Sequence, residues 1–457
     1  MKRAAFWLGI ILLIGILTAC GGQDQAGDEN ANTQNPPAVN QEQPSNQEPA
    51  QEVKEQPQAP ETAELTIVTP ANHTAEAFNQ RFGDAIREKF PHYTINYIPR
   101  SDISFDNLLV TNTMVDIVYA AVLDFGRGPV SYGMVYDMSE LIEKHDVDLD
   151  RISVDWYDGL REMWEDNIYA LPVSLESMAL FYNKDIFDNF GIAYPKDGIT
   201  WDEVFELNER MTRTEGNTDY IGISFALAQH FSLNSLSVPY VDAETETATF
   251  NKYGGEWRAL YETIAVRPFE ATGYREKTEQ LNRLPHQTEF MAGEAAMFAG
   301  LVHSPLSWAD MQNVNWDLTS YPTYSMRPNT GAQGNLLLFG ITNMSQQKEA
   351  AMEVIKYLLS DEYQKITSAA GNIPIVLNDA TISAFAQDTY YADRNVQSIF
   401  SIPFAPLSER TLLDPVTTAL YRSQLLDLAF GNVDMNTMMR TIEQEINLEL
   451  EIAKKQQ

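Results

Sequence analysis

The stretch from residue 65 to residue 121 alternates between two hydrophobic patterns, and this alternation restricts the fold more than any other feature. A short apolar run, Leu65–Thr69, precedes a helical pattern in which large apolar residues recur every four positions up to Phe90. The alternating residues Tyr93–Tyr97, a second helical stretch and a second apolar run, which ends near Ala121, follow. Strand, helix and strand in this order predict a parallel α/β layer. In such sheets, ligands bind at the loops after the strands.

The first 20 residues have the pattern of an export signal. Two basic residues precede an apolar run from Ala4 to Leu17, which is too short to cross a bilayer as a helix. The tetrad Leu17–Cys20 resembles the lipobox of bacterial lipoproteins. This resemblance implies that residues 1–19 are a signal peptide that is removed, and that Cys20 is acylated. An ordinary cleaved signal with an accidental cysteine is the alternative.

Composition describes the rest of the chain in broad terms. Cys20 is the only cysteine, which excludes an intramolecular disulfide and a cysteine-based metal site. Residues 20–62 are mostly Gln, Asn, Glu, Pro and Ala, and this composition predicts a disordered linker. Residues 63–457 are too many for one core and predict two domains. The net charge of −33 argues against binding to nucleic acid or to anionic lipid.

The sequence contains no recognisable catalytic motif. It has no histidine pair at zinc-site spacing, no serine in a nucleophile elbow and no P-loop. Asp146, Asp148 and Asp150 occupy the first three ligand positions of a calcium loop. Arg151 replaces the glycine that this loop requires, and Tyr157 replaces its bidentate glutamate. We therefore expect a solvated acidic loop, with no metal, cofactor or catalytic residue; bound calcium is the alternative.

Four segments resemble the family 1 extracellular solute-binding proteins, the group that contains maltose-binding protein. They are Val115–Ala120, Tyr169–Met211, Glu289–Gly300 and Gly340–Pro374. The resemblance implies an α/β fold of the two-lobed, type II periplasmic-binding-protein kind. Each lobe would be a mostly parallel sheet flanked by helices, and a hinge would join the two. The resemblance also implies a solute held between the lobes and an ABC importer as the partner.

The same resemblance divides the folded region into lobes. Lobe one would comprise residues 63–172 and 337–373, and lobe two residues 173–336 and 374–457. The chain would first cross the hinge near Leu171–Ser174. Ligand contacts with both lobes would favour their closure.

Several site residues follow from the resemblance. Sugar sites combine aromatic faces with carboxylates or amides that bind hydroxyl groups. Glu176 stands at the position of a carboxylate that contacts the sugar in maltose-binding proteins; a surface acid is the alternative. Asp124 resembles a cleft aspartate, although its loop is one residue shorter than the family pattern. Tyr119, in the strand before Asp124, is a further candidate for ligand binding. Asn72 and His73 lie in the first strand's exit loop, which faces the cleft in this fold, and a surface turn is the alternative for His73.

An aromatic ligand contact is expected near the third segment. Trp308 follows the position where the family commonly places an aromatic residue that stacks on the ligand, although it comes later than in the pattern. His303 and Tyr324 are further candidates for the same site. We expect Trp201 to be structural, because it follows a helix cap.

Together these features predict a non-catalytic, monomeric receptor that is lipid-anchored at the extracellular face of the cell membrane. It would capture a carbohydrate, an oligosaccharide, for an ABC importer, although a sensor is also open as the partner. The alternatives are a surface glycoside hydrolase with paired carboxylates, a binding protein for a non-sugar solute such as a peptide, or for an amino sugar acid or a uronate, and a structural adhesin. The strong negative charge of the chain disfavours an acidic ligand unless Arg100 or Arg127 lines the cleft.

Overall fold

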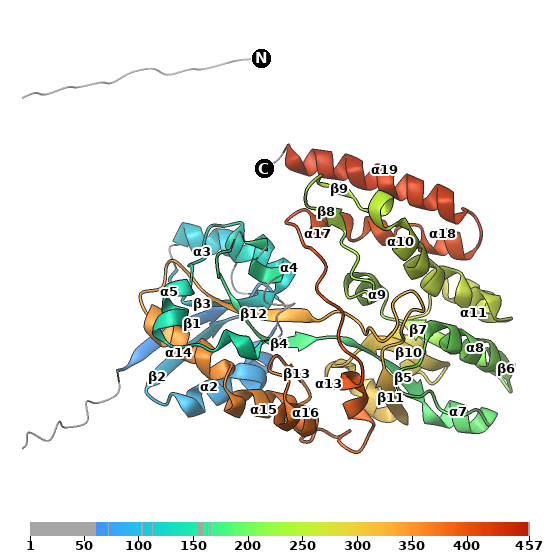
Figure 1. Cartoon of the computed structure of the whole chain (residues 1–457). Helices are drawn as coiled ribbons and strands as arrows, with labels where there is room; N and C mark the ends of the chain where they lie inside the picture. Colours follow the sequence, from blue (N-terminus) through green and yellow to red (C-terminus); the bar gives the residue numbers. More distant parts are fainter. Residues whose placement is uncertain are drawn as a thin grey trace, which may run out of the picture. The chain divides into compact units, whose positions relative to one another are not determined.

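Two β-sheets, each covered by helices, form the framework of the protein (Figure 1). The computed structural model describes residues 61–71, 73–101, 104–111, 113–152, 159–161, 163–164 and 166–455. These residues belong to the compact unit Pro60–Gln457. The predicted signal peptide, the lipidation site Cys20 and almost all of the predicted linker lie outside the described residues, as does Asn72.

The first lobe contains a six-stranded sheet in the order β13-β4-β12-β3-β1-β2. Its strands are β1 (Ala63–Val68), β2 (Tyr93–Ile98), β3 (Ile117–Ala121), β4 (Leu171–Glu176), β12 (Asn335–Ile341) and β13 (Ile373–Pro374). The accompanying helices are α1 (Ala75–Phe78), α2 (Asp84–Lys89), α3 (Phe105–Thr111), α4 (Val122–Phe125), α5 (Ser139–Lys144), α14 (Lys348–Leu358), α15 (Asp361–Ala369) and α16 (Asp379–Ala384). Strand β1 pairs in parallel with β2 and β3, which confirms the order predicted from the alternating pattern.

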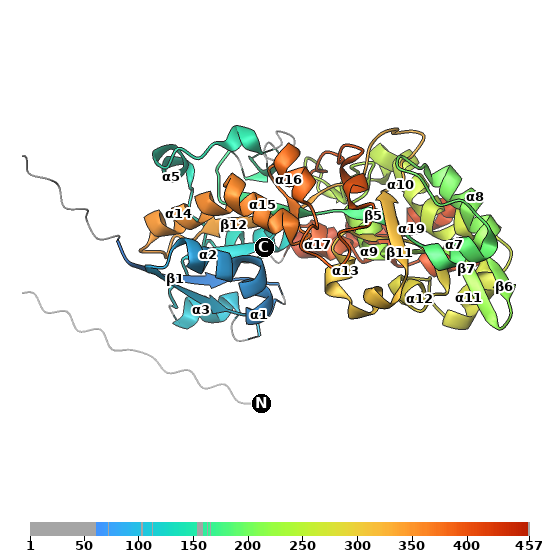
Figure 2. The same ribbon diagram turned by 90° about the horizontal axis from the view of Figure 1, so that it is seen from below.

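The second lobe contains a five-stranded sheet in the order β11-β5-β10-β7-β6. Its strands are β5 (Met178–Asn183), β6 (Arg213–Glu215), β7 (Thr218–Phe225), β10 (Ala295–Leu301) and β11 (Trp316–Ser320). The helices around it include α7 (Lys184–Phe190), α8 (Trp201–Met211), α9 (Leu227–Ser232), α10 (Phe250–Ala265), α11 (Tyr274–Leu281), α12 (Gln287–Met291) and α13 (Ser304–Ser307). The C-terminal helices are α17 (Asp414–Thr417), α18 (Leu425–Ala429) and α19 (Met435–Lys454). Both α18 and α19 pack against α10. In the second view, α10 and α19 lie on the same side of the molecule as β7 and β11 (Figure 2).

The chain passes from the first sheet to the second at Ser177, between β4 and β5. It returns as β12, which runs antiparallel to both of its neighbours, β3 and β4. The two-lobed α/β fold is confirmed, but the sheets are more mixed than the predicted mostly parallel sheets, because a strand that returns from the other lobe enters the sheet in the opposite direction. Strand β4 continues to Glu176, beyond the crossing expected near Leu171–Ser174. The lobe boundaries at residues 172 and 336 stay a prediction.

Local sequence signals explain how α8 begins. Thr200 accepts a hydrogen bond from the backbone N–H of Glu203, and the Glu203 side chain accepts one from the backbone N–H of Thr200. This capping box satisfies two backbone donors that a helix start leaves free. Trp201, the first residue of α8, is buried, as expected. Among the residues that the structure describes, no helix has the length and apolar character needed to cross a membrane.

Candidate ligand-binding site

Two adjoining cavities lie at the loops after the strands of the first sheet, and residues of the second lobe also line one of them, the central cavity. The central cavity has a volume of about 230 Å³, and residues of β12 and α9 are among those that line it. The side cavity has a volume of about 340 Å³, and the end of β1 and the start of α3 contribute to its wall. Asp124 and Arg127 line both cavities. The strand-exit loops near Pro70 and after Ala121 therefore line cavities, as the α/β pattern predicts.

Glu176 is the last residue of β4 and lines the central cavity. Its Oε1 atom lies 3.9 Å from Nη1 of Arg81, a residue of the helical segment 79–83 in the first lobe. The same oxygen lies 3.7 Å from Nδ1 of His303, which follows β10 of the second lobe. The carboxylate thus stands between a guanidinium from one lobe and an imidazole from the other.

Arg81 is the residue of this cluster that sequence reasoning missed. Its Nη2 donates a hydrogen bond of 2.9 Å to Oγ of Ser174 on β4, and its guanidinium lies 5.3 Å from the centre of the Phe82 ring. Only 17% of its side chain is exposed. In the sequence, Arg81 is one polar position in an amphipathic helical pattern, and no local signal distinguishes it from a surface residue.

His73 and Tyr119 form a second contact close to Arg81. Nδ1 of His73 and Oη of Tyr119 are 3.1 Å apart, and the two rings stack at 5.8 Å. Tyr97 donates a 2.8 Å hydrogen bond to the carbonyl of His73. Burial lowers the pKa of His73, and the charge of Arg81 lowers it further. Neither His73 nor Tyr119 is among the residues that line the two cavities, so their contact with a ligand stays a prediction.

The environment of His303 favours its neutral form. Burial lowers the pKa of His303, while the charge of Glu176 opposes that shift. Among the described residues, no hydrogen-bond partner is present for its buried Nδ1 atom. The 3.7 Å separation from Glu176 is longer than a hydrogen bond, so Glu176 does not satisfy this nitrogen.

Asp124 is one of the two residues that line both cavities. It lies in α4, and its Oδ1 atom is 4.0 Å from Nη1 of Arg127. The side chains of Asp124 and Arg127 are about half-exposed, at 47% and 58%. An ion pair that is this long and this exposed is weak, so either side chain can turn toward a ligand at little cost in free energy.

The structure places Trp308 and Tyr324 away from these cavities. Half-buried Trp308 packs against Phe298 of β10, with the ring centres 6.1 Å apart. Tyr324 is buried, and its hydroxyl lies 2.9 Å from Oγ1 of Thr263 and 3.5 Å from Nε2 of His230. Neither residue lines the central or the side cavity.

The aromatic residues that line the side cavity are Phe105 and Tyr132, whose rings stack at 5.7 Å. Sequence reasoning missed both. The position of Tyr132 in the sequence, shortly after the strand-exit loop that contains Asp124, could have indicated that it lies near the cavity. A stacking role for Trp308 or Tyr324 stays a prediction that this arrangement does not support.

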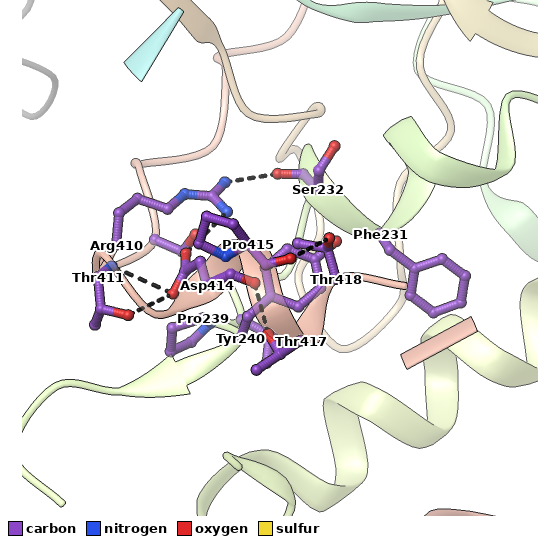
Figure 3. A network of polar contacts seen from close by, with 12 residues as sticks. Phe231, Ser232, Pro239, Tyr240, Arg410, Thr411, Asp414, Pro415, Thr417 and Thr418 are labelled. Carbon is purple, nitrogen blue, oxygen red and sulfur yellow. Dashed lines mark hydrogen bonds and ion pairs between the residues drawn. The ribbon is translucent and has the colours of Figure 1, made fainter. Parts of the chain in front are cut away.

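Arg410 contributes a positive charge to the wall of the central cavity. Its Nη2 donates a 2.6 Å hydrogen bond to the carbonyl of Ser232 at the end of α9 (Figure 3). Asp414 lies 3.8 Å from its Nη1 atom and accepts hydrogen bonds from the backbone and the hydroxyl of Thr411. Burial raises the pKa of Asp414 to about 6, although Arg410 opposes the shift.

The acidic loop near Asp148 shows local hydrogen bonding. The Asp148 side chain accepts a 3.2 Å hydrogen bond from the backbone N–H of Asp150. Within the described part of the chain, no group of three or more His, Cys, Asp or Glu side chains is placed to hold a metal ion.

Comparison with solved structures shows the same fold in other proteins. A sugar transporter from Rhizobium etli, in an open conformation, has 17% identity and a TM-score of 0.66, over 84% of this chain and 98% of that one. The cyclic alpha-maltosyl-1,6-maltose binding protein from Arthrobacter globiformis has 16% identity and a TM-score of 0.65, over 85% and 99%. An ABC substrate-binding protein from Listeria monocytogenes, in complex with cycloalternan, has 16% identity and a TM-score of 0.62, over 85% and 98%.

The family model described as bacterial extracellular solute-binding protein matches residues 71–365. This match covers more than half of the chain and includes the whole second sheet, four of the six strands of the first sheet and most of the residues that line the two cavities. The chain therefore belongs to the bacterial extracellular solute-binding protein family.

Proposed function

We propose that this protein is a receptor that binds a carbohydrate, an oligosaccharide, between its two lobes and delivers it to an ABC importer. The observation that carries the proposal is the position of Glu176, which lines the central cavity between Arg81 of the first lobe and His303 of the second. A carboxylate in this position can accept hydrogen bonds from sugar hydroxyls. A ligand bound there would contact groups from both lobes and would favour their closure.

The chemistry of the cavity walls supports a carbohydrate ligand. Asp124, Glu176 and Asn335 offer oxygen and amide groups for hydroxyls, and Tyr132 offers a ring face. The two cavities, of about 230 and 340 Å³, share the lining residues Asp124 and Arg127. Together they have room for more than one sugar ring. One protein of similar fold was solved in complex with cycloalternan, and another is named a cyclic alpha-maltosyl-1,6-maltose binding protein.

A surface glycoside hydrolase is the second candidate, because Asp124 and Glu176 line one cavity and could form a carboxylate pair. An arginine nitrogen lies within 4.0 Å of each carboxylate. This arrangement suits the acceptance of hydrogen bonds better than the donation of a proton to a leaving group. We therefore favour binding without hydrolysis.

Thermal unfolding of the full-length protein against a panel of neutral and acidic oligosaccharides tests the proposal. A true ligand at a hundred times its Kd should stabilise the protein by about 2.7 kcal/mol. Glu176→Gln should weaken the response, whereas Glu143→Gln, on the exposed surface of α5, should not. No response to any carbohydrate would contradict the proposal, and release of reducing ends by the protein would favour the hydrolase.

We also propose that a lipid on Cys20 anchors the receptor at the extracellular face of the membrane, with residues 20–62 as a tether. The lipobox-like tetrad at Leu17–Cys20 supports this proposal. Cys20→Ala should move the protein from the membrane fraction to the medium and leave its ligand affinity unchanged. A variant that stays in the membrane fraction would argue against the anchor.

A further inference from the structure

Arginine is concentrated at the two cavities. Arg100 and Arg127 line the side cavity, and Arg127 and Arg410 line the central cavity. The acidic residues in these walls are Asp124 and Glu176, and none of the described lining residues is a lysine. The whole chain contains 31 basic and 64 acidic residues. Three arginines and two carboxylates line the cavities, whereas acidic residues outnumber basic ones about two to one in the whole chain. A third carboxylate, Asp414, lies behind the wall at 3.8 Å from Arg410.

Arg127 is placed to contact a ligand in either cavity. Its side chain is 58% exposed, and its one ion pair among the described residues, with Asp124, is long at 4.0 Å. A guanidinium carries five N–H donors in a planar fork that matches a carboxylate. Most of these donors are thus available to a bound group.

Arg100 also lines the side cavity and comes two residues after the end of β2. It is exposed, and no ion pair between described residues involves it. Two guanidinium groups therefore face one cavity, and only one of them has a carboxylate beside it. A positive potential at this cavity favours an anionic group.

Arg410 adds a third, more buried charge. Its side chain is 9% exposed, and its Nη1 atom has no hydrogen-bond partner among the described residues. The nearest carboxylate, Asp414, is 3.8 Å away, which is beyond hydrogen-bond distance (Figure 3). A buried guanidinium with incomplete hydrogen bonding is stabilised by any anionic group that enters the adjoining cavity.

We propose that the ligand of this site is an acidic oligosaccharide that carries a uronate, whose carboxylate binds Arg127 and Arg100. The hydroxyl groups next to it would bind Asp124 and Glu176, and a sugar ring would pack on Tyr132. The two carboxylates in the walls favour a singly charged group over a phosphate, because they repel a doubly charged anion more strongly. This inference rests on the proposed function as a carbohydrate receptor and narrows it to one class of sugar.

Calorimetric titration of the full-length protein tests the inference with matched pairs of ligands. Trimers of galacturonate, glucuronate and mannuronate would each be compared with the same trimer after reduction of its carboxyl groups to alcohols. At least one acidic trimer should bind ten times more tightly than its neutral partner. The difference should shrink as the salt concentration rises, because the exposed arginines are screened.

Single substitutions separate the contribution of the arginines from general effects. Arg127→Gln and Arg100→Gln should each weaken binding of the acidic trimer at least fivefold and should weaken binding of its neutral partner by a clearly smaller factor. Arg440→Gln is the matched control, because Arg440 is exposed on α19 and lies in neither cavity. It should change neither affinity.

Two outcomes would overturn the inference, and they differ in what else they affect. If neutral trimers bind as tightly as their acidic partners or more tightly, the uronate assignment fails while the proposed carbohydrate receptor stands. If no carbohydrate of either kind binds, the proposed function fails together with the inference.

Discussion

The carboxylate of Glu176 lies 3.7 Å from the imidazole of His303, so the last residue of a first-lobe strand meets the turn after a second-lobe strand. Arg81 approaches the same carboxylate oxygen to 3.9 Å. Ion pairs of this length in partly exposed positions contribute little to stability. The cluster is therefore better suited to positioning polar groups for a ligand than to holding the lobes together.

Replacement of Glu176 by Gln should lower the pKa of His303. The glutamate charge is the factor that raises this pKa, and burial and the charge of Arg81, which both lower it, would remain. A histidine titration followed by NMR measures the change. Glu143→Gln should leave the titration of His303 where it is, and an unchanged pKa in the Glu176 variant would mean that the two side chains do not interact in solution.

His230 should make the protein sensitive to acid. It is fully buried, with its Nδ1 atom 2.8 Å from the hydroxyl of Tyr321, and burial lowers its pKa from 6.5 to about 3. The unfolded chain takes up the proton first as the pH falls. The contribution of His230 to stability is therefore complete above pH 6.5 and decreases by about 1.4 kcal/mol per pH unit as the pH falls toward 3.

Urea unfolding of the wild type and of His230→Gln between pH 7 and about pH 4.5 checks this prediction. Glutamine keeps a hydrogen-bonding group near Tyr321 but does not titrate in this range. The free energy of unfolding of the variant should fall less steeply with decreasing pH. Parallel curves for the two proteins would show that His230 does not carry the effect.

The start of α8 should depend on Thr200. Oγ1 of Thr200 accepts a 3.3 Å hydrogen bond from the backbone of Glu203, and Thr200→Ala removes this acceptor. The expected cost is about 1 kcal/mol in the free energy of unfolding. Thr200→Ser retains the hydroxyl, so chemical unfolding should give it a stability close to that of the wild type. Equal losses in the two variants would indicate an effect of the methyl group instead.

Gly222 on β7 allows α8 to pack closely against the second sheet. A Cβ atom there would lie 2.3 Å from Cα of Asn208, a backbone atom that cannot move away without displacing the helix. Gly222→Ala should therefore destabilise the protein by at least about 1 to 3 kcal/mol. Gly255 provides the matched control, because it is in α10 and nothing lies within 4 Å of an added Cβ atom.

Gly255→Ala should stabilise the protein by up to about 1 kcal/mol, since alanine is the better helix former. Thermal or urea unfolding of both variants measures the two effects on one scale. Similar shifts of the same sign would contradict the packing explanation for Gly222.

The sequence by itself determined the local elements and the family. The apolar spacing in residues 65–121 predicted the strands and helices that the structure contains, because side-chain direction repeats every two residues in a strand and every 3.6 in a helix. The helix cap expected before Trp201 also predicted the start of α8, because capping depends on hydrogen bonds between residues that are close in sequence. The resemblance also directed attention to Glu176 and His303, which the structure brings to within 3.7 Å of each other.

Only the tertiary structure decided which residues share the site. Arg81 meets β4 at Ser174, 93 positions later in the chain, and no local pattern encodes that approach. Trp308 and Tyr324 pack against neighbouring side chains, whereas Tyr132 lines a cavity. The burial of a side chain depends on which distant segments pack around it, and here the return of β12 between β3 and β4 sets that arrangement. Spacing along the chain specifies each element, but the packing of elements far apart in sequence specifies the site.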